Sequence, residues 1–320
     1  MSDKTAFHSI LVPVDGSILA EAAIPHALTL AERARSKVQF VFVYQDRLPL
    51  EPVELAWQYL LQLTARARER LGDSVSSALL HGPVAANLVK QARKIGADLV
   101  IMTTHGRGGL ERAWLGSVTD QLIRRIGIPV LVIRPVDGVV APQAQPSEIL
   151  VPLDGSTLAE TALPPAAALA RLWDAELTVV QIVYPVPIVA EPDRAVPEIS
   201  IQELTAIARA SAEEYVRLTA ERLRVSGVKA SGMALMGTDG PAQQLRELAR
   251  PGQVSLIAIA THGRGGIRRF ILGSVTDKLV RTAEVPVLVV PPMPRTRPAR
   301  QAKPERVRAL DVAEAFASGA

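Results

Sequence analysis

Short apolar runs alternate along the chain with longer stretches whose apolar residues recur at helical spacing. In the first half, the apolar runs predict β-strands over residues 10–14, 38–43, 75–80, 99–102 and 130–133. The periodic stretches predict helices over 17–34, 53–71, 84–95 and 117–126. Continuous apolar strands are typical of a parallel sheet buried between two layers of helices. The first half therefore predicts a doubly wound α/β domain of about 140 residues.

The second half of the chain repeats the first. SILVPVDGS at 9–17 returns as EILVPLDGS at 148–156. THGRGGLERAWLGSVTDQLIR at 104–124 returns as THGRGGIRRFILGSVTDKLVR at 261–281, with 15 of 21 positions identical. Apolar runs predict matching strands near 149–153, 177–183, 230–235, 256–260 and 287–290. The chain is a tandem duplication, with predicted domains at 1–141 and 142–294, a proline-containing join near 135–147 and a tail at 295–320.

The second copy contains an insertion. Asp15 corresponds to Asp154 and His105 to His262, and the stretch between these points is longer in the second copy. Tyr44 and Tyr184 still correspond, which places the insertion after Tyr184. There the proline-rich segment 184–203 predicts a loop that leads into a longer helix.

Composition and charge exclude several classes of protein. The 320 residues include no cysteine, which excludes a disulfide scaffold, a thiolate metal site and a cysteine nucleophile, and fits a reducing cytoplasm. No apolar run approaches the roughly 18 residues of a membrane span, and the N-terminus does not resemble a signal peptide.

Of the net charge of +4, the tail at 295–320 carries +3, from six basic and three acidic residues. The tail is predicted to be partly disordered, and a polyanion-binding role for it stays open. The nearly neutral remainder gives little support to a nucleic-acid partner.

Candidate chemistry lies where strands end. In doubly wound sheets, ligands bind beyond the carboxyl ends of the strands, where the direction of winding reverses. In each copy an Asp-Gly-Ser turn, at 15–17 and 154–156, follows the first strand. A glycine-rich segment, at 104–119 and 261–276, follows the fourth strand and enters a helix. Free N–H groups and hydroxyls at a helix N-terminus suit a phosphate, and the aspartate suits a ribose or a magnesium-bound phosphate.

Alternative interpretations of these residues remain open. Ser117 would cap the following helix whether or not a ligand binds. His105 and His262 favour a backbone-bonding role in the loop, because the five histidines show no ligand spacing. Arg107 and Arg264 suit either a phosphate or solvent. The chain has no P-loop, G-x-G-x-x-G, G-x-S-x-G or H-E-x-x-H motif, so the sequence predicts binding more than turnover.

Together these motifs resemble the universal stress protein family in its tandem two-domain form, over nearly all of residues 7–292. The ATP-binding members carry G-x2-G-x9-G-[ST]. Both copies match this motif from its second glycine onward, at 106–117 and 263–274. The first glycine is replaced by Thr103 and by Ala260, and the larger threonine would crowd the ribose more.

The resemblance implies two tandem Rossmann-like (adenine nucleotide alpha hydrolase-like) domains, each a five-stranded parallel sheet flanked by helices. It places Asp15 and Asp154 against the ribose or a metal. The residues that it places against the adenine are Pro13, Val43, Met102, Pro152, Val183 and Ile259. It assigns to the phosphates Gly106, Gly116, Ser117, Val118, Thr119, Gly263, Gly273, Ser274, Val275 and Thr276. For Val43, Met102, Val183 and Ile259, ordinary sheet core is the alternative.

The implied function is that of a cytoplasmic, ATP-binding regulator in the stress response, with Mg²⁺ as a candidate metal and with unidentified protein partners. A slow Mg-dependent ATPase is one alternative. The other is a nucleotide-independent interaction module that recruits partners through the insertion and the tail. The family pairs through its last strands, so strands 130–133 and 287–290 are expected to pair within this chain, and a further homodimer stays open.

Overall fold

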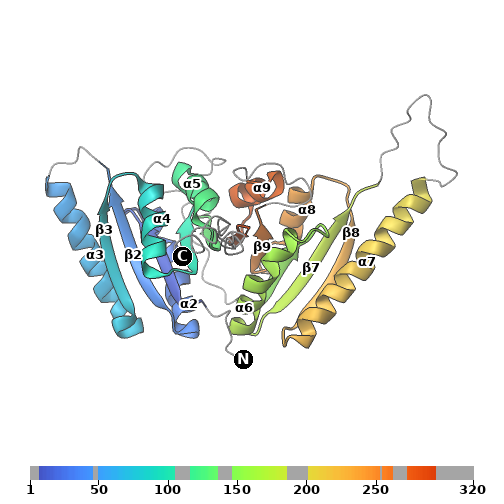
Figure 1. The fold of residues 1–320 in the computed structure, drawn as a ribbon, viewed down its shortest axis with the longest axis horizontal. Helices are drawn as coiled ribbons and strands as arrows, with labels where there is room; N and C mark the ends of the chain where they lie inside the picture. The colour runs from blue at the N-terminus through green and yellow to red at the C-terminus, as the bar shows by residue number, and fades with distance from the viewer. Residues whose placement is uncertain are drawn as a thin grey trace, which may run out of the picture.

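Both halves of the chain fold as the predicted alternation of strands and helices in a computed structural model (Figure 1). The structure describes residues 7–45, 50–104, 116–135, 146–185, 201–252, 254–261 and 272–292. The first copy contains β1 (Ser9–Val14), α1 (Ile18–Glu21), α2 (Ala23–Ala34), β2 (Lys37–Tyr44), α3 (Leu50–Leu71), the 3₁₀ turn η1 (Gly72–Ser74), β3 (Val75–His81), α4 (Val84–Ile95), β4 (Leu99–Thr103), α5 (Ser117–Ile126) and β5 (Val130–Ile133). The second contains β6 (Glu148–Pro152), η2 (Ala159–Ala162), α6 (Leu163–Trp173), β7 (Glu176–Val183), α7 (Ile201–Val225), β8 (Ala230–Met236), α8 (Pro241–Leu248), β9 (Leu256–Ala260), α9 (Ser274–Thr282) and β10 (Val287–Val290).

The one predicted helix at 17–34 is two helices in the structure. The first, α1, ends at Glu21, and α2 begins at Ala23. Pro25 has no N–H to donate to the carbonyl of Glu21, which lies one helical turn earlier, so the first helix cannot continue through it. Pro164 and Pro165 stand at the matching place in the second copy, where a 3₁₀ turn precedes α6.

All ten strands of the described ranges belong to one sheet, in the order β3-β2-β1-β4-β5-β10-β9-β6-β7-β8. Each half is parallel, as predicted, and its inner strands are largely buried, whereas the edge strands β3 and β8 are partly exposed. Helices α2, α3, α6 and α7 contribute to the buried core on one face. Helices α4, α5, α8 and α9 contribute to the core on the other. The predicted α/β architecture with helices on both faces is therefore confirmed.

The two halves join through their last strands, as predicted. Strands β5 and β10 pair antiparallel, with Leu288 opposite Leu131 and valines opposite each other on either side. Leu131 and Leu288 are both buried. The pairing removes two open sheet edges and leaves β3 and β8 at the outside. The predicted domain limits stay predictions, because the join at 136–145 lies outside the described residues.

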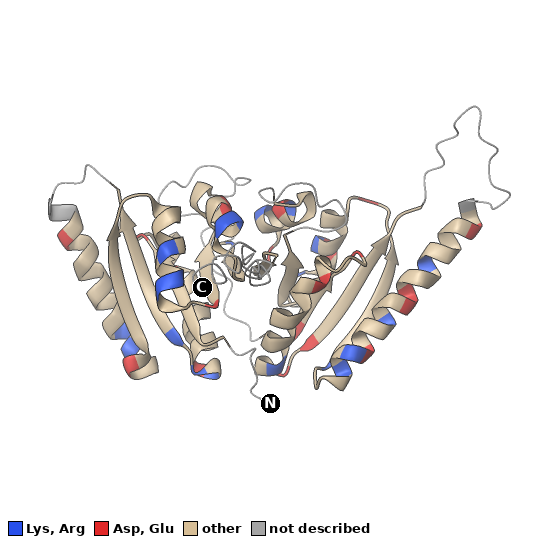
Figure 2. Ribbon diagram, in the orientation of Figure 1, with Lys and Arg blue, Asp and Glu red and all other residues tan. Residues whose placement is uncertain are grey.

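Charged residues of α5 and α9 also meet near this join (Figure 2). Asp120 forms an ion pair of 2.8 Å with Arg124 on α5, and Asp277 forms one of 2.8 Å with Arg281 on α9. The hydrogen bond to Asp277 raises the pKa of Arg281 above its ordinary value, and the charge of Asp120 in the other copy adds to the effect. The first turn of α5 is therefore an electrostatic neighbour of the last turn of α9.

The strand register corrects one predicted correspondence. Strand β1 pairs with β2 in the same register in which β6 pairs with β7, so Lys37 corresponds to Glu176 just as Ser9 corresponds to Glu148. Val43 therefore matches Ile182, and both pack on the core beneath α4 and α8. The predicted match of Val43 with Val183 is wrong. Successive side chains of a strand point to opposite faces, so Val183 points away from that core.

The insertion follows β7, as predicted. Strand pairing places residue 75 opposite 38 in the first copy and residue 230 opposite 177 in the second. The stretch from residue 177 to 230 is longer than the stretch from 38 to 75, so the added residues lie mainly between β7 and β8. The predicted longer helix is present, since α7 has 25 residues and α3 has 22. The predicted loop lies outside the described residues from 186 to 200.

Helix α7 is polar on its outer side. Ion pairs join Arg209 to Glu213, and Arg217 to both Glu214 and Glu221, on this exposed side (Figure 2).

No helix of the described ranges has the length and hydropathy to cross a membrane.

His26 of α2 should make the protein sensitive to acid. Burial lowers the pKa of His26 from 6.5 to about 4. Between these values the unfolded chain binds more protons than the folded chain, so stability falls as the pH falls through this window. We expect the free energy of unfolding to drop by about 1–2 kcal/mol from this group between pH 7 and pH 5. Urea unfolding at both pH values should show the drop in the wild type and a smaller one in His26→Gln; equal drops would contradict the assignment.

Candidate functional site

The strands that precede the predicted site loops lie side by side at the two switch points of the sheet. Strand β1 lies beside β4, and β6 lies beside β9. From β1 the chain continues toward β2, and from β4 it continues toward β5 on the other side. The carboxyl ends of β1 and β4 therefore flank the crevice in which ligands of such sheets bind. The same arrangement recurs at β6 and β9.

The Asp-Gly-Ser turns present a carboxylate in a defined orientation. Asp15 Oδ1 accepts hydrogen bonds from the N–H of Ser17 at 2.9 Å and from its hydroxyl at 2.6 Å. Ser17 Oγ in turn accepts from the N–H of Ala20 and caps α1. Gly16 has a φ of 78°, a conformation that favours glycine. The carboxylate of Asp15 is thus held at the end of β1 and remains half-buried.

The second copy builds the same turn. Asp154 Oδ1 accepts from the N–H of Ser156 at 2.9 Å, and Ser156 Oγ accepts from the N–H of Ala159 at 3.1 Å. Gly155 has a φ of 82°. Both predicted aspartates therefore lie at the carboxyl edge of the sheet.

A close backbone contact sets the start of α5. The N–H of Gly116 donates to the carbonyl of Thr104 at 3.0 Å, and Gly273 makes the matching bond to Thr261 at 2.7 Å. A Cβ on Gly116 would lie 2.6 Å from the Thr104 carbonyl oxygen. Glycine is therefore required at this position by packing alone. Gly116 is the N-cap, so the interpretation of Ser117 as the cap is wrong.

The first turns of α5 and α9 offer one exposed hydroxyl each. Ser117 and Ser274 are exposed, and their backbone N–H groups belong to the helix turn that has no intrahelical acceptors. By contrast, Thr119 is buried, and its hydroxyl donates to the carbonyl of Thr103 at 3.2 Å. Thr276 donates likewise to Ala260 at 2.8 Å. These two threonines tie the helix starts to the strands.

The other predicted residues divide between the edge and the core. Pro13 and Pro152 are half-buried at the ends of their strands. Met102 and Ile259 are 5% and 7% exposed and belong to the core, as their alternative interpretation expects. Val118 and Val275 pack partly against the same core. Thr103 and Ala260 are buried at the ends of β4 and β9. Gly106, Gly263, His105, His262, Arg107 and Arg264 lie outside the described residues.

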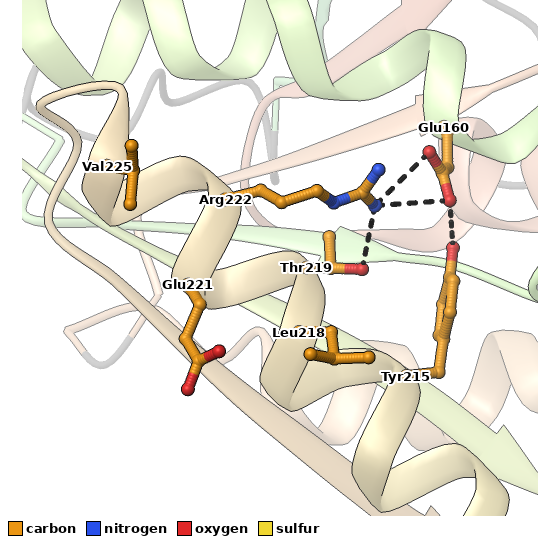
Figure 3. Close-up of a pocket in the computed structure, with 7 residues that line it drawn as sticks. All are labelled: Glu160, Tyr215, Leu218, Thr219, Glu221, Arg222 and Val225. Atoms are coloured by element: carbon orange, nitrogen blue, oxygen red, sulfur yellow. Dashed lines mark hydrogen bonds and ion pairs between the residues drawn. The ribbon is translucent and has the colours of Figure 1, made fainter.

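The sequence analysis missed a cluster beside the second turn. Glu160 of η2 accepts a 2.8 Å hydrogen bond from the hydroxyl of Tyr215 on α7 (Figure 3). Arg222 approaches the same carboxylate at 3.4 Å and donates to Thr219 at 3.1 Å. With Leu218, Glu221 and Val225, these residues line an open groove of about 700 Å³.

The repeat contained a signal for this cluster. Glu21, Tyr59 and Arg66 stand at the matching positions of the first copy, and the tyrosine and the arginine keep the same spacing in α3 as in α7. The three residues are far apart in sequence and lie outside the two matching blocks. In the second copy, only the packing of η2 beside α7 brings Glu160, Tyr215 and Arg222 together.

The described part of each site suits anion binding. A helix N-terminus with an exposed serine hydroxyl stands on one side, and an oriented carboxylate stands on the other. No group of three potential metal ligands occurs among the described residues.

Comparison with known proteins identifies the family. The universal stress protein family profile matches residues 6–134 and again residues 147–291. The chain belongs to the universal stress protein family. It is 30% identical to the universal stress protein Rv2005c of Mycobacterium tuberculosis over 311 residues, which cover 90% of this chain and 99% of that protein. It is 31% identical to the universal stress protein MJ0531 of Methanocaldococcus jannaschii over 144 residues, covering 41% of this chain and 84% of that protein.

Solved structures agree on the fold of this universal stress protein. A universal stress protein from Archaeoglobus fulgidus superposes with a TM-score of 0.66 at 16% identity, covering 90% of this chain and 99% of that one. The protein PA1789 from Pseudomonas aeruginosa gives a TM-score of 0.65 at 21% identity, covering 90% and 94%. Because each copy matches the family separately, the tandem form predicted from the repeat is confirmed.

Proposed function

We propose that this universal stress protein binds one ATP at each switch point and acts as a nucleotide-dependent regulator in the stress response. One observation carries the proposal. In both copies an oriented aspartate and an open helix N-terminus follow neighbouring strands, β1 with β4 and β6 with β9. A nucleotide offers the two matching groups, a ribose with two hydroxyls and a chain of phosphates. The location would be the cytoplasm.

The proposal gives each group a role. The first-turn N–H groups and the hydroxyls of Ser117 and Ser274 would bind phosphate oxygens. Asp15 and Asp154 would accept hydrogen bonds from the ribose or hold Mg²⁺. Thr119 and Thr276, whose hydroxyl protons are used by strand carbonyls, would position the helix starts rather than donate to phosphate. The predicted adenine residues would line the base, with Ile182 in place of Val183: Pro13, Val43, Met102, Pro152 and Ile259. The other predicted phosphate residues would complete the contacts to the phosphates: Gly106, Gly116, Val118, Gly263, Gly273 and Val275.

The aspartates provide the test of this function. We expect the wild type to bind about two ATP per chain in a calorimetric titration with Mg²⁺. Asp15→Ala and Asp154→Ala should each weaken one site by about tenfold or more, because a hydrogen bond to a charged group contributes about 1.5–3 kcal/mol. Asp73→Ala is the matched control, since it removes the same charge from the exposed turn η1, at the outer edge of the sheet.

The outcomes separate the candidate functions. Unchanged affinity in both site variants would contradict the assignment of the aspartates. No ATP bound to the wild type, in titration or released on heat denaturation, would favour an interaction module. Multiple turnovers that both site variants abolish would favour a slow ATPase, with Asp15 and Asp154 holding the metal.

A further inference from the structure

Three hydrogen bonds connect Asp154 to the long helix α7. The N–H of Ser156 donates to Asp154 Oδ1 at 2.9 Å. The N–H of Glu160 donates to the carbonyl of Ser156 at 3.2 Å. The hydroxyl of Tyr215 donates to Glu160 Oε1 at 2.8 Å (Figure 3). The orientation of the Asp154 turn therefore depends on a side chain of another element, distant in the sequence.

Helix α7 is a rigid support for this contact. Val216 and Ala220, on the turns beside Tyr215, are 2% and 1% exposed and pack in the core. Arg222 lies 3.4 Å from the carboxylate of Glu160 and approaches it from a different direction than the tyrosine hydroxyl (Figure 3). The carboxylate is thus held from two sides by one well-packed helix.

The first copy contains the same residues, but its last contact does not have the geometry of a well-formed hydrogen bond. The N–H of Ser17 donates to Asp15 at 2.9 Å, and the N–H of Glu21 donates to the carbonyl of Ser17 at 3.1 Å. Burial raises the pKa of Tyr59, and the charge of Glu21 and a side-chain hydrogen-bond interaction with it raise the pKa further. Yet the buried Tyr59 hydroxyl reaches no partner with the geometry of a hydrogen bond in the described part of the chain. The link from the Asp15 turn to α3 through this tyrosine is therefore weaker than its counterpart in the second copy.

The protonation of Tyr215 suits its role as a donor. Burial raises the pKa of Tyr215 above its ordinary value, and the hydrogen bond to Glu160 raises it further. The charge of Asp154 adds to this, which places the aspartate within electrostatic reach of the ring hydroxyl. The hydroxyl thus keeps its proton at every pH at which the protein is expected to act.

We propose that the Tyr215–Glu160 hydrogen bond positions Asp154 for the nucleotide and makes the second site the tighter of the two. The inference rests on the proposed function. Tyr215 and Glu160 are positioning residues, because they act through the turn and not on the ligand. A turn that is already ordered loses less conformational entropy when a ligand binds, so the affinity is higher. In the first site, binding still has to order the turn.

The test compares matched tyrosine variants in two single-site backgrounds. Asp15→Ala leaves the second site to be titrated with Mg-ATP, and Asp154→Ala leaves the first. We expect Tyr215→Phe to weaken the second site by about three- to tenfold. Tyr59→Phe, its matched control, should change the first site by less than about twofold, because no hydrogen bond of good geometry is lost. Each comparison is made within one site, so the difference between Thr103 and Ala260 does not enter.

Conservative variants separate positioning from general stability. Glu160→Gln keeps an acceptor for Tyr215 and should retain most of the affinity, whereas Glu160→Ala should match Tyr215→Phe. Equal losses from Tyr215→Phe and Tyr59→Phe, or no loss from either, would overturn the proposal. Thermal unfolding of each variant checks that it is folded.

Amide hydrogen exchange tests the positioning without a nucleotide. Tyr215→Phe should speed exchange of the Ser156 N–H, which bonds to Asp154, while Tyr59→Phe should leave that of Ser17 unchanged. If no site binds ATP, the proposed function fails, but faster exchange at Ser156 would still support the positioning bond. Unchanged exchange at Ser156 would contradict it whether or not ATP binds.

Discussion

Gly116→Ala is expected to destabilise the protein by about 2–3 kcal/mol, because the added methyl group overpacks a close backbone contact. Its Cβ would lie 2.6 Å from the carbonyl oxygen of Thr104, and a backbone atom cannot move aside without shifting β4 or α5. The loss should appear in urea unfolding of the ligand-free protein. The same shift would move the first turn of α5, so ATP affinity at the first site should fall as well.

Gly240→Ala is the matched control for this substitution. Gly240 is also the N-cap glycine of a helix, with a φ of −62° against −56° for Gly116. A Cβ on Gly240 meets no atom within 4 Å. We expect its effect on the free energy of unfolding to stay within about 0.5 kcal/mol. Equal effects at the two glycines would show that the contact with Thr104 does not explain the requirement for glycine.

Leu131→Ala and Leu288→Ala should each cost about 3 kcal/mol, since both side chains are buried where the two copies join. The two leucines lie directly opposite each other on β5 and β10. Their double variant should therefore deviate from additivity by about 1 kcal/mol. The free energies of unfolding of the four proteins, measured in urea, give this coupling directly.

A second pair provides the control for the coupling. Ile149 of β6 is buried in the same core as Leu131, but β10 and β9 lie between their strands, a separation of about 14 Å. Leu131→Ala combined with Ile149→Ala should be additive within about 0.5 kcal/mol. Strong coupling in this pair, or none between Leu131 and Leu288, would contradict the strand order at the join.

Much of the fold could be predicted because the relevant signals are local. Each strand is a short apolar run bounded by Gly, Pro or polar residues, and such a run is decided by its own residues and burial. The Asp-Gly-Ser turns were also predictable, because their contacts join residues that are close neighbours in the sequence. The resemblance to the universal stress protein family, applied to a tandem chain, made the pairing of the last strands an expected result.

Contacts across long separations were not predictable from these signals. The likeness of Tyr44 to Tyr184 suggests that these two residues correspond. Strand pairing instead matches Tyr44 to Val183. This shift by one position puts the side chain of Val183 on the other face of the sheet. Ser117 has the residue type of a cap, but the approach of Gly116 to Thr104 decides where α5 begins. Thr119 has the residue type of a phosphate donor, but its hydroxyl reaches a strand carbonyl instead.

The sequence by itself determined the duplication, the order of strands and helices and the edge of the sheet where the site lies. These depend on residue patterns that either copy carries within a short stretch of chain. Only the tertiary structure decided which polar groups are accessible to a ligand and which already form hydrogen bonds within the protein. The Tyr215 hydroxyl donates a well-formed hydrogen bond to Glu160, whereas the Tyr59 hydroxyl only approaches Glu21, and this difference depends on how one helix packs beside one turn. Both copies carry the same three residue types, so composition could not distinguish them. The two copies differ because the strength of a hydrogen bond depends steeply on distance and angle.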